Sequence, residues 1–228
     1  MTLDCNISNI IIMPAKNIVK KYIENGYYHI YNRGVEKRII FKDKEDYSVF
    51  LHYLKLYLST PEELHKNKIK KRRPDKYIKK NLSEEVILLS FVLMPNHFHL
   101  LVKQQTKDGI TKLMRRLITA YVMYFNKKQD RIGPLFQSAY KAALIDKEEY
   151  LLHITRYIHL NPKKNLKNYS SYPYYLGDKH ASWIKPDLVL EYFKETKKQN
   201  NSVNSYQQFV EDYKFDSEKY LADLILES

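Results

Sequence analysis

The sequence predicts an α+β protein in which an antiparallel sheet and its helices follow a split βαβ order, with a small helical extension at the C-terminus. Segments of strand length alternate with amphipathic helical patterns in the order β-α-β-β-α-β-α over residues 27–162. Near the middle, "VILLSFVLM" (Val86–Met94) is a continuous apolar run, typical of a central strand covered on both faces. Together these observations predict a ferredoxin-like sheet with helices packed on it.

The first half of this pattern begins with "YYHIYNRG" (residues 27–34), where aromatic and β-forming residues end in glycine and predict a strand. Residues 43–58 carry an acidic first turn and apolar residues at three- and four-residue spacing, which predicts an amphipathic helix. Residues 59–83 follow as a basic insertion. It contains "KNKIKKRRPDKYIKK", in which nine of fifteen residues are Lys or Arg. Such a run is a solvated loop, an arm that binds phosphates, or both.

The second half of the pattern starts where Pro95 and Asn96 turn the chain, so that residues 97–103 return as the next strand. A long amphipathic helix is predicted over Gly109–Lys128, and a further strand over residues 135–145. Residues 146–162 begin with acidic side chains that suit a helix N-terminus and stop near a proline.

We expect the chain to contain one main domain with additions at both ends. Its 228 residues are enough for one well-filled core but not for two full domains. The expected parts are an N-terminal extension (1–26), the main domain (27–165, with the insertion at 59–83) and an accessory C-terminal region (166–228). In the last part, helical patterns lie near residues 186–196 and 202–213.

Composition narrows the class of protein. The formal net charge of +13 favours a polyanionic partner, with nucleic acid first and an anionic membrane surface second. Cys5 is the only cysteine, which excludes an internal disulfide and a cysteine-based zinc site and fits a reducing cytoplasm. No run of about eighteen apolar residues occurs, so no membrane-spanning helix is expected.

Two histidines one residue apart, His97 and His99, lie in a predicted strand. Alternate side chains of a strand share a face, so both imidazoles project the same way, roughly 6.6 Å apart, while Phe98 points into the opposite layer. Two imidazoles in this arrangement can reach one metal ion; alternatively, each is hydrogen-bonded in the core. Burying them without partners would cost on the order of 1–3 kcal/mol each, so we expect that something satisfies them.

Further ligands must come from another part of the chain, because no acidic partner of the H-E-x-x-H kind accompanies the pair. In "HITRYIHLNP", Tyr157 and Asn161 are four residues apart and therefore neighbours on one helix face. An Asn side-chain oxygen is a suitable ligand for Mg²⁺ or Mn²⁺, and Tyr157 would lie beside whatever that ion polarises. A structural role for Tyr157 stays open, since most of the 21 tyrosines must pack or lie at the surface.

The combination of "YNRG", "LMPNHFHLLV", "GPLFQ..YK" and "YLLHITRYIHLNP" resembles the single-tyrosine HUH transposases of the IS200-like family, and among them the REP-associated tyrosine transposases. The resemblance extends from about Tyr27 to Tyr175, and the motifs occur in the family order. It implies the HUH endonuclease core as the fold, which makes residues 27–165 the catalytic domain.

The resemblance also implies the roles of individual residues. His97 and His99 match the paired metal ligands, and Tyr157 matches the nucleophile. Asn161 takes the place of the third ligand, which is Gln in the insertion-sequence relatives and commonly Asn in the REP-associated branch. The implied cofactor is Mg²⁺ or Mn²⁺. An Arg often found after "LFQ" is replaced by Ala139, a departure at an expected DNA contact.

The implied reaction is metal-dependent cleavage and rejoining of single-stranded DNA that bears a hairpin or palindromic repeats. Free tyrosine has a pKa of about 10, so an ion that polarises the scissile phosphate would assist its attack. The product is a 5′-phosphotyrosine with a free 3′ hydroxyl, and reversal rejoins strands without ATP. Because neutral imidazole is the ligand form, we expect activity to weaken as pH falls through about 6 to 6.5.

We expect contacts to the DNA backbone from basic residues on the sheet, on the helices and in the insertion. These candidates are Arg33, Lys70, Lys71, Arg72, Arg73, Arg115, Arg116, Lys127, Lys128 and Lys141. Tyr172 and Tyr174 either stack on unpaired bases or pack in the core. The protein is expected in the cytoplasm, associated with the nucleoid, as a monomer or homodimer and without a membrane partner.

Two rival hypotheses stay open. The first is a non-catalytic nucleic-acid-binding protein on the same ferredoxin-like fold, although no RNP1-type aromatic signature is present. The second is a metal-dependent phosphodiesterase that uses activated water, with Tyr157 structural. It differs from the transposase hypothesis in forming no covalent protein–DNA species.

Overall fold

The computed structural model describes residues 22–66, 81–161, 169–196 and 206–211. Four strands form one antiparallel sheet in the order β2-β3-β1-β4. They are β1 (Tyr27–Arg33), β2 (Val86–Met94), β3 (His97–Gln104) and β4 (Lys141–Ile145). β3 lies antiparallel between β1 and β2, so β1 and β2 run in the same direction. This is the split βαβ arrangement, and the predicted fold class is confirmed.

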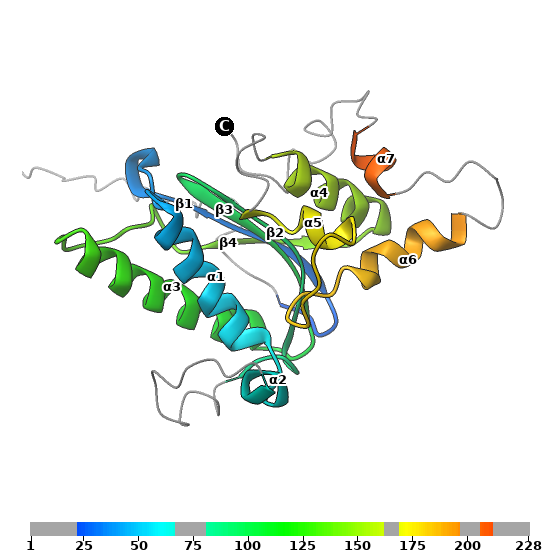
Figure 1. Ribbon diagram of the computed structural model, residues 1–228, viewed down its shortest axis with the longest axis horizontal. Helices are drawn as coiled ribbons and strands as arrows, with labels where there is room; N and C mark the ends of the chain where they lie inside the picture. The colour runs from blue at the N-terminus through cyan, green and yellow to red at the C-terminus, as the bar shows by residue number, and fades with distance from the viewer. Residues whose placement is uncertain (1–21, 67–80, 162–168, 197–205, 212–228) are drawn as a thin grey trace, which may run out of the picture.

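Helices cover both faces of the sheet (Figure 1). One face carries α1 (Lys44–Leu58) and α3 (Gly109–Lys128), which pack against each other. The other face carries α4 (Glu148–Leu160) and the short C-terminal helices α5 (Tyr172–Tyr175), α6 (Asp187–Thr196) and α7 (Tyr206–Glu211). None of the helices in the described segments is long and apolar enough to cross a membrane.

Strand β3 divides its side chains between two hydrophobic clusters. Phe98 and Leu100 are fully buried in the cluster beneath α1 and α3. Leu101 is buried in the second cluster, with α4 residues such as Ile154 and Ile158. The alternation predicted for the histidine strand is therefore confirmed, and His97 and His99 share the face that α4 covers.

The segment after α4 seals the edge of the sheet at β2. Ser171 donates its backbone N–H to the carbonyl of Phe91 at 2.9 Å, and Lys185 donates to Leu88 at 2.9 Å. An unpaired edge strand would expose such groups to association with another chain. Since Tyr172 and Trp183 are buried in the two clusters as well, the described part of residues 166–228 packs directly on the predicted main domain.

Three local expectations were wrong. The strand predicted over residues 135–145 covers only Lys141–Ile145. Before it, Asn32 donates a side-chain hydrogen bond to the carbonyl of Ser138 at 3.1 Å, which interrupts the ladder beside β1. The insertion begins with a helix, α2 (Pro61–Lys66), and the accessory region contains a further helix, α5, ahead of the helical pattern predicted near residues 186–196. Thr60 and Glu63 cap α2 reciprocally, a signal visible in the sequence.

Replacing Phe98 with Ala should lower the free energy of unfolding by about 3–5 kcal/mol, because it empties a fully buried site between Phe50 and Phe136. Urea denaturation followed by circular dichroism measures this loss. Ile132→Ala is the control: this side chain is 98% exposed, so its truncation should change stability by less than about 0.5 kcal/mol. Equal effects of the two substitutions would contradict the assignment of Phe98 to the core.

Candidate active site

The two histidines of β3 lie next to each other at the end of the sheet that carries the β2–β3 turn. Their ring centroids are 5.1 Å apart and the ring planes are nearly perpendicular, at 86°. His97 is opposite Arg33 of β1, and His99 is opposite Tyr31. The Nδ1 atom of His97 is 2.6 Å from the side-chain oxygen of Asn96. The pair thus has its two rings on one face, as the strand alternation predicted.

A third histidine, which the sequence did not single out, completes this group. His29 of β1 is fully buried, and its Nε2 atom lies 2.9 Å from Nδ1 of His99. Its ring stacks on Tyr31 at a centroid distance of 4.9 Å. The other ring nitrogen of His99, Nε2, is buried and makes no hydrogen bond to any residue that the structure describes. The sequence of residues 27–33 indicates only which face of β1 carries His29. The contact with His99 depends on the register of β1 against β3, which the sequence does not show.

Tyr157 of α4 lies over the histidines of the same chain. Its ring centroid is 5.4 Å from that of His99 and 6.3 Å from that of His29, and both contacts are edge-on, at 88° and 79°. The predicted nucleophile is therefore in contact with His99, one of the two predicted histidine ligands, although the two residues are some sixty positions apart in the sequence. α4 forms here because an acidic first turn precedes a stripe of buried residues that includes Leu151, Ile154 and Ile158.

The direction of α4 decides where Asn161 lies. β4 ends at Ile145, opposite Tyr27, so α4 starts at that end of the sheet and returns toward the β2–β3 turn. Asn161 is the C-cap residue, and its backbone N–H donates to the carbonyl of Tyr157 at 3.0 Å. The four residues from Tyr157 to Asn161 advance the helix by about 6 Å, a step similar to the one from His99 to His97. Asn161 thus lies beyond Tyr157 in the direction of His97.

Burial keeps both ligand candidates neutral. It lowers the pKa of His97 to about 4, with a further contribution from the nearby positive charge of Arg33. Burial also lowers the pKa of His99 well below its ordinary value, followed by the effects of His29, His97 and Arg33. Neutral imidazole is the form that binds metal. The prediction that activity weakens as pH falls through about 6 to 6.5 assumed the pKa of free histidine; with the lower pKa of His97, we expect the weakening at a more acidic pH.

The residues present fit a divalent ion only if an amide contributes. In the described segments, no group of three His, Cys, Asp or Glu side chains could hold a metal. His97, His99 and the oxygen of Asn161 give the mixed nitrogen and oxygen set that the sequence suggested. The buried, unpaired Nε2 of His99 is the observation that supports this fit, because such an atom costs free energy unless it acquires a partner.

Of the basic residues predicted to contact DNA, Arg33 and Lys141 share the face of the histidines. The Nζ of Lys141 is 5.8 Å from the centre of the Tyr31 ring. Arg33 is partly buried, and its Nε atom has no hydrogen-bond partner in the described part of the chain. These two cations therefore flank the group formed by the histidines and Tyr157.

The other predicted cations lie elsewhere. Arg115, Arg116 and Lys127 are on α3, across the sheet from Tyr157. Lys128 is bound by carboxylates of Asp43, Glu45 and Asp46 at 2.7–2.9 Å, so its charge is locally neutralised. The remaining four, Lys70, Lys71, Arg72 and Arg73, fall outside the described residues.

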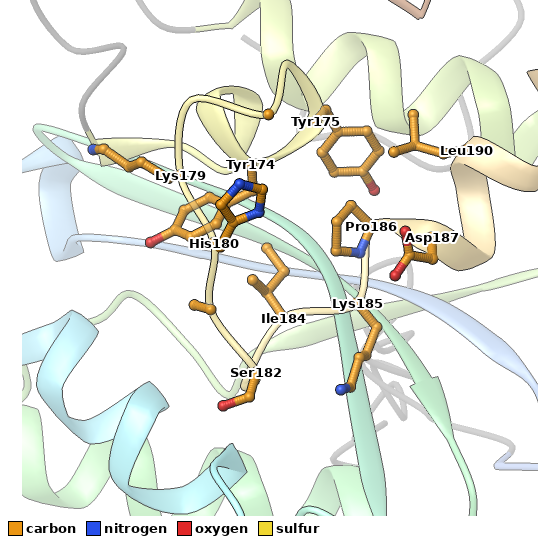
Figure 2. Close-up of a pocket in the computed structure, with 12 residues that line it drawn as sticks. Tyr174, Tyr175, Lys179, His180, Ser182, Ile184, Lys185, Pro186, Asp187 and Leu190 are labelled. Carbon is orange, nitrogen blue, oxygen red and sulfur yellow. The ribbon is translucent and has the colours of Figure 1, made fainter. Parts of the chain in front are cut away.

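The two tyrosines considered for base stacking differ. Tyr172 is buried and donates its hydroxyl to Glu211 at 3.0 Å, so it packs in the core. Tyr174 is half-buried against Trp183 and lines a cavity of about 530 Å³. Figure 2 shows this cavity beside the first turn of α6, with Lys179, His180 and Lys185 around it.

Residues of the C-terminal region contact α4 on both sides of Tyr157. His159 is buried, with its two ring nitrogens 2.5 Å from the hydroxyl of Tyr206 and 2.6 Å from that of Ser171. Arg156 lies over the ring of Phe209 at 4.2 Å and donates to its carbonyl at 3.2 Å. Arg156 directly precedes Tyr157 and His159 follows it by two residues, so these contacts restrict the helix at the site itself.

The fold and the site can be compared with known proteins. Residues 23–161 match the family model described as "Transposase IS200 like", which covers more than half of the chain. The chain is therefore a transposase, a DNA-processing enzyme. More narrowly, it belongs to the IS200-like transposase family. No curated protein matches the sequence.

Solved structures also share features with this chain. One is a REP-associated tyrosine transposase bound to a REP hairpin, 15% identical, with a TM-score of 0.45; the match covers 70% of this chain and 84% of that one. Another is the tRNA(His) guanylyltransferase of Saccharomyces cerevisiae, 13% identical, with a TM-score of 0.31; the match covers 82% of this chain and 77% of that one. At identities this low, the similarity concerns the course of the backbone and not the chemistry of the side chains.

Proposed function

We propose that this transposase cleaves and rejoins single-stranded DNA through a covalent bond to Tyr157. The observation that carries the proposal is the edge-on contact of Tyr157 with His99, whose Nε2 is buried and unpaired among the described residues. A tyrosine that only packs in the core does not need an unpaired histidine nitrogen beside it. A nucleophilic tyrosine benefits from one, because its phenol must attack a phosphate at a point where the developing charge is stabilised.

His97, His99 and Asn161 would hold the divalent ion, Mg²⁺ or Mn²⁺. When bound, it supplies Lewis-acid polarisation of the scissile phosphate and neutralises charge that develops there. The contribution of the chain is to keep both imidazoles neutral by burial and to hold them on one face of β3. Asn161 provides a hard oxygen donor one turn after the nucleophile.

The reaction then follows from the residues that surround Tyr157. Its phenol oxygen attacks the phosphorus, the bond to the 3′ oxygen breaks, and the leaving oxygen takes up a proton while the phenol loses one. Arg33 and Lys141, which flank the site on β1 and β4, are suited to hold the phosphates on either side. The 5′-phosphotyrosine conserves the bond energy, so attack by another 3′ hydroxyl rejoins strands without ATP.

The proposed substrate is single-stranded DNA with a hairpin or palindromic repeats, as in the REP-associated branch. The formal charge of +13 supports a polyanionic partner. Asn161, in place of glutamine, supports the REP-associated branch. The cavity lined by Tyr174, Lys179 and Lys185 offers an aromatic ring and two cations for an unpaired nucleotide beside the hairpin.

Replacing Tyr157 with Phe should abolish a covalent protein–DNA adduct, because the ring remains but the attacking oxygen is lost. The full-length protein is incubated with end-labelled hairpin DNA and Mn²⁺, and adducts are separated on a denaturing gel. Tyr150→Phe, the same change on the same helix, should leave the adduct unchanged. An adduct that survives in Tyr157→Phe would refute the nucleophile. DNA cut by the wild type without any adduct would favour a water-dependent phosphodiesterase.

Replacing His97 with Ala should weaken Mn²⁺ binding by more than about 100-fold, since loss of a direct ligand exceeds the 10–100-fold cost of losing an outer partner. Isothermal titration calorimetry measures the affinity. Binding of the hairpin DNA in EDTA should persist, because the backbone contacts come from other residues. His52→Ala, an exposed histidine on α1 across the sheet, is the control. Cleavage that continues in EDTA would refute the metal assignment.

A further inference from the structure

Either His29 or His99 could donate the hydrogen bond that joins the two rings, and the surroundings of His99 constrain which of them does. One hydrogen lies between His29 Nε2 and His99 Nδ1, which are 2.9 Å apart. If His29 carried it, the neutral His99 ring would bear its own hydrogen on Nε2. That hydrogen would be a buried donor with no acceptor among the described residues. Orphaned buried N–H groups are rarer in proteins than unpaired acceptors.

The opposite arrangement leaves His99 with a nitrogen lone pair that can bind a metal ion. If His99 donates its Nδ1–H to His29, the Nε2 of His99 keeps its lone pair, and this nitrogen is on the edge of the ring not engaged by His29. Histidines that bind metals almost always donate their other ring N–H to an outer partner, which fixes the tautomer and the ring orientation. The usual partners are carboxylates, carbonyls and water; here an imidazole nitrogen takes that place.

We propose that His29 is a positioning residue that accepts a hydrogen bond from Nδ1 of His99 and so presents the Nε2 lone pair of His99 to the divalent ion. This inference rests on the proposed function, because it assigns a partner to one of its metal ligands. His29 is itself fixed: it is fully buried and stacks on Tyr31 at 4.9 Å. The register of β1 against β3 puts the two rings nearly parallel, with centroids 5.0 Å apart.

Two substitutions separate positioning from packing. His29→Phe keeps an aromatic ring against Tyr31 but removes the acceptor. His29→Gln removes the ring but can place an amide oxygen near the position of Nε2. If His29 positions His99, the Phe variant should bind Mn²⁺ about 10–100-fold more weakly, and the Gln variant should stay close to the wild type. A packing role predicts the reverse order.

The decisive readout needs neither metal nor DNA. Long-range ¹H–¹⁵N correlation spectra of the metal-free, full-length protein identify which ring nitrogen of His99 carries the hydrogen, with the signals assigned by their absence from His99→Gln. We expect hydrogen on Nδ1 in the wild type and in His29→Gln, and a mixture of tautomers in His29→Phe. Thermal melts confirm that each variant is folded.

The outcomes distinguish this inference from the proposed function. Hydrogen on Nε2 of His99 in the wild type, or an unchanged tautomer in His29→Phe, would overturn the role of His29 even if Mn²⁺ binds. A wild type that binds no Mn²⁺ would refute the proposed function. Hydrogen on Nδ1 would then still establish the hydrogen bond from His99 to His29, without a metal for it to serve.

Discussion

The pairing of β1 with β3 is the constraint on which the rest of this structure depends. Its register sets Tyr31 opposite His99 and Arg33 opposite His97, and it brings His29 diagonally next to His99. A slip of one residue would turn every side chain of one strand to the other face. Hydrophobic burial prevents that slip, since Phe98 and Leu100 are fully enclosed on the opposite face. The site is therefore held by the core behind it.

The second hydrophobic cluster gives the site its other wall. Ile154 and Ile158 fix α4 on the sheet, and Tyr157, which is partly buried beside them, lies over the histidines as a result. Residues after the predicted main domain contribute to this wall through Ser171 and Tyr206, which enclose His159. The accessory region is thus coupled to the position of Tyr157 by direct contacts, and truncating it would disturb the site as well as the sheet edge.

Charge is distributed unevenly over this arrangement. The chain is strongly basic as a whole, yet the described residues near Tyr157 include only Arg33 and Lys141 among the predicted DNA contacts. Lys128 is occupied by three carboxylates and serves the packing of α1 against α3. Overall charge therefore supports affinity for nucleic acid, whereas the proposed chemistry relies on these two cations and on the histidines beside Tyr157.

The sequence by itself determined the order of elements, the bounds of β2 and α3, and the shared face of His97 and His99, because strand and helix periods and local turns are properties of short segments. It also indicated Tyr157 and Asn161, through their helical spacing and a family resemblance. Only the tertiary structure decided that His29 contacts His99, that Lys128 is neutralised and Tyr172 buried, and that the C-terminal helices hold α4. These facts depend on register and on contacts between residues distant in the chain, which no local pattern encodes.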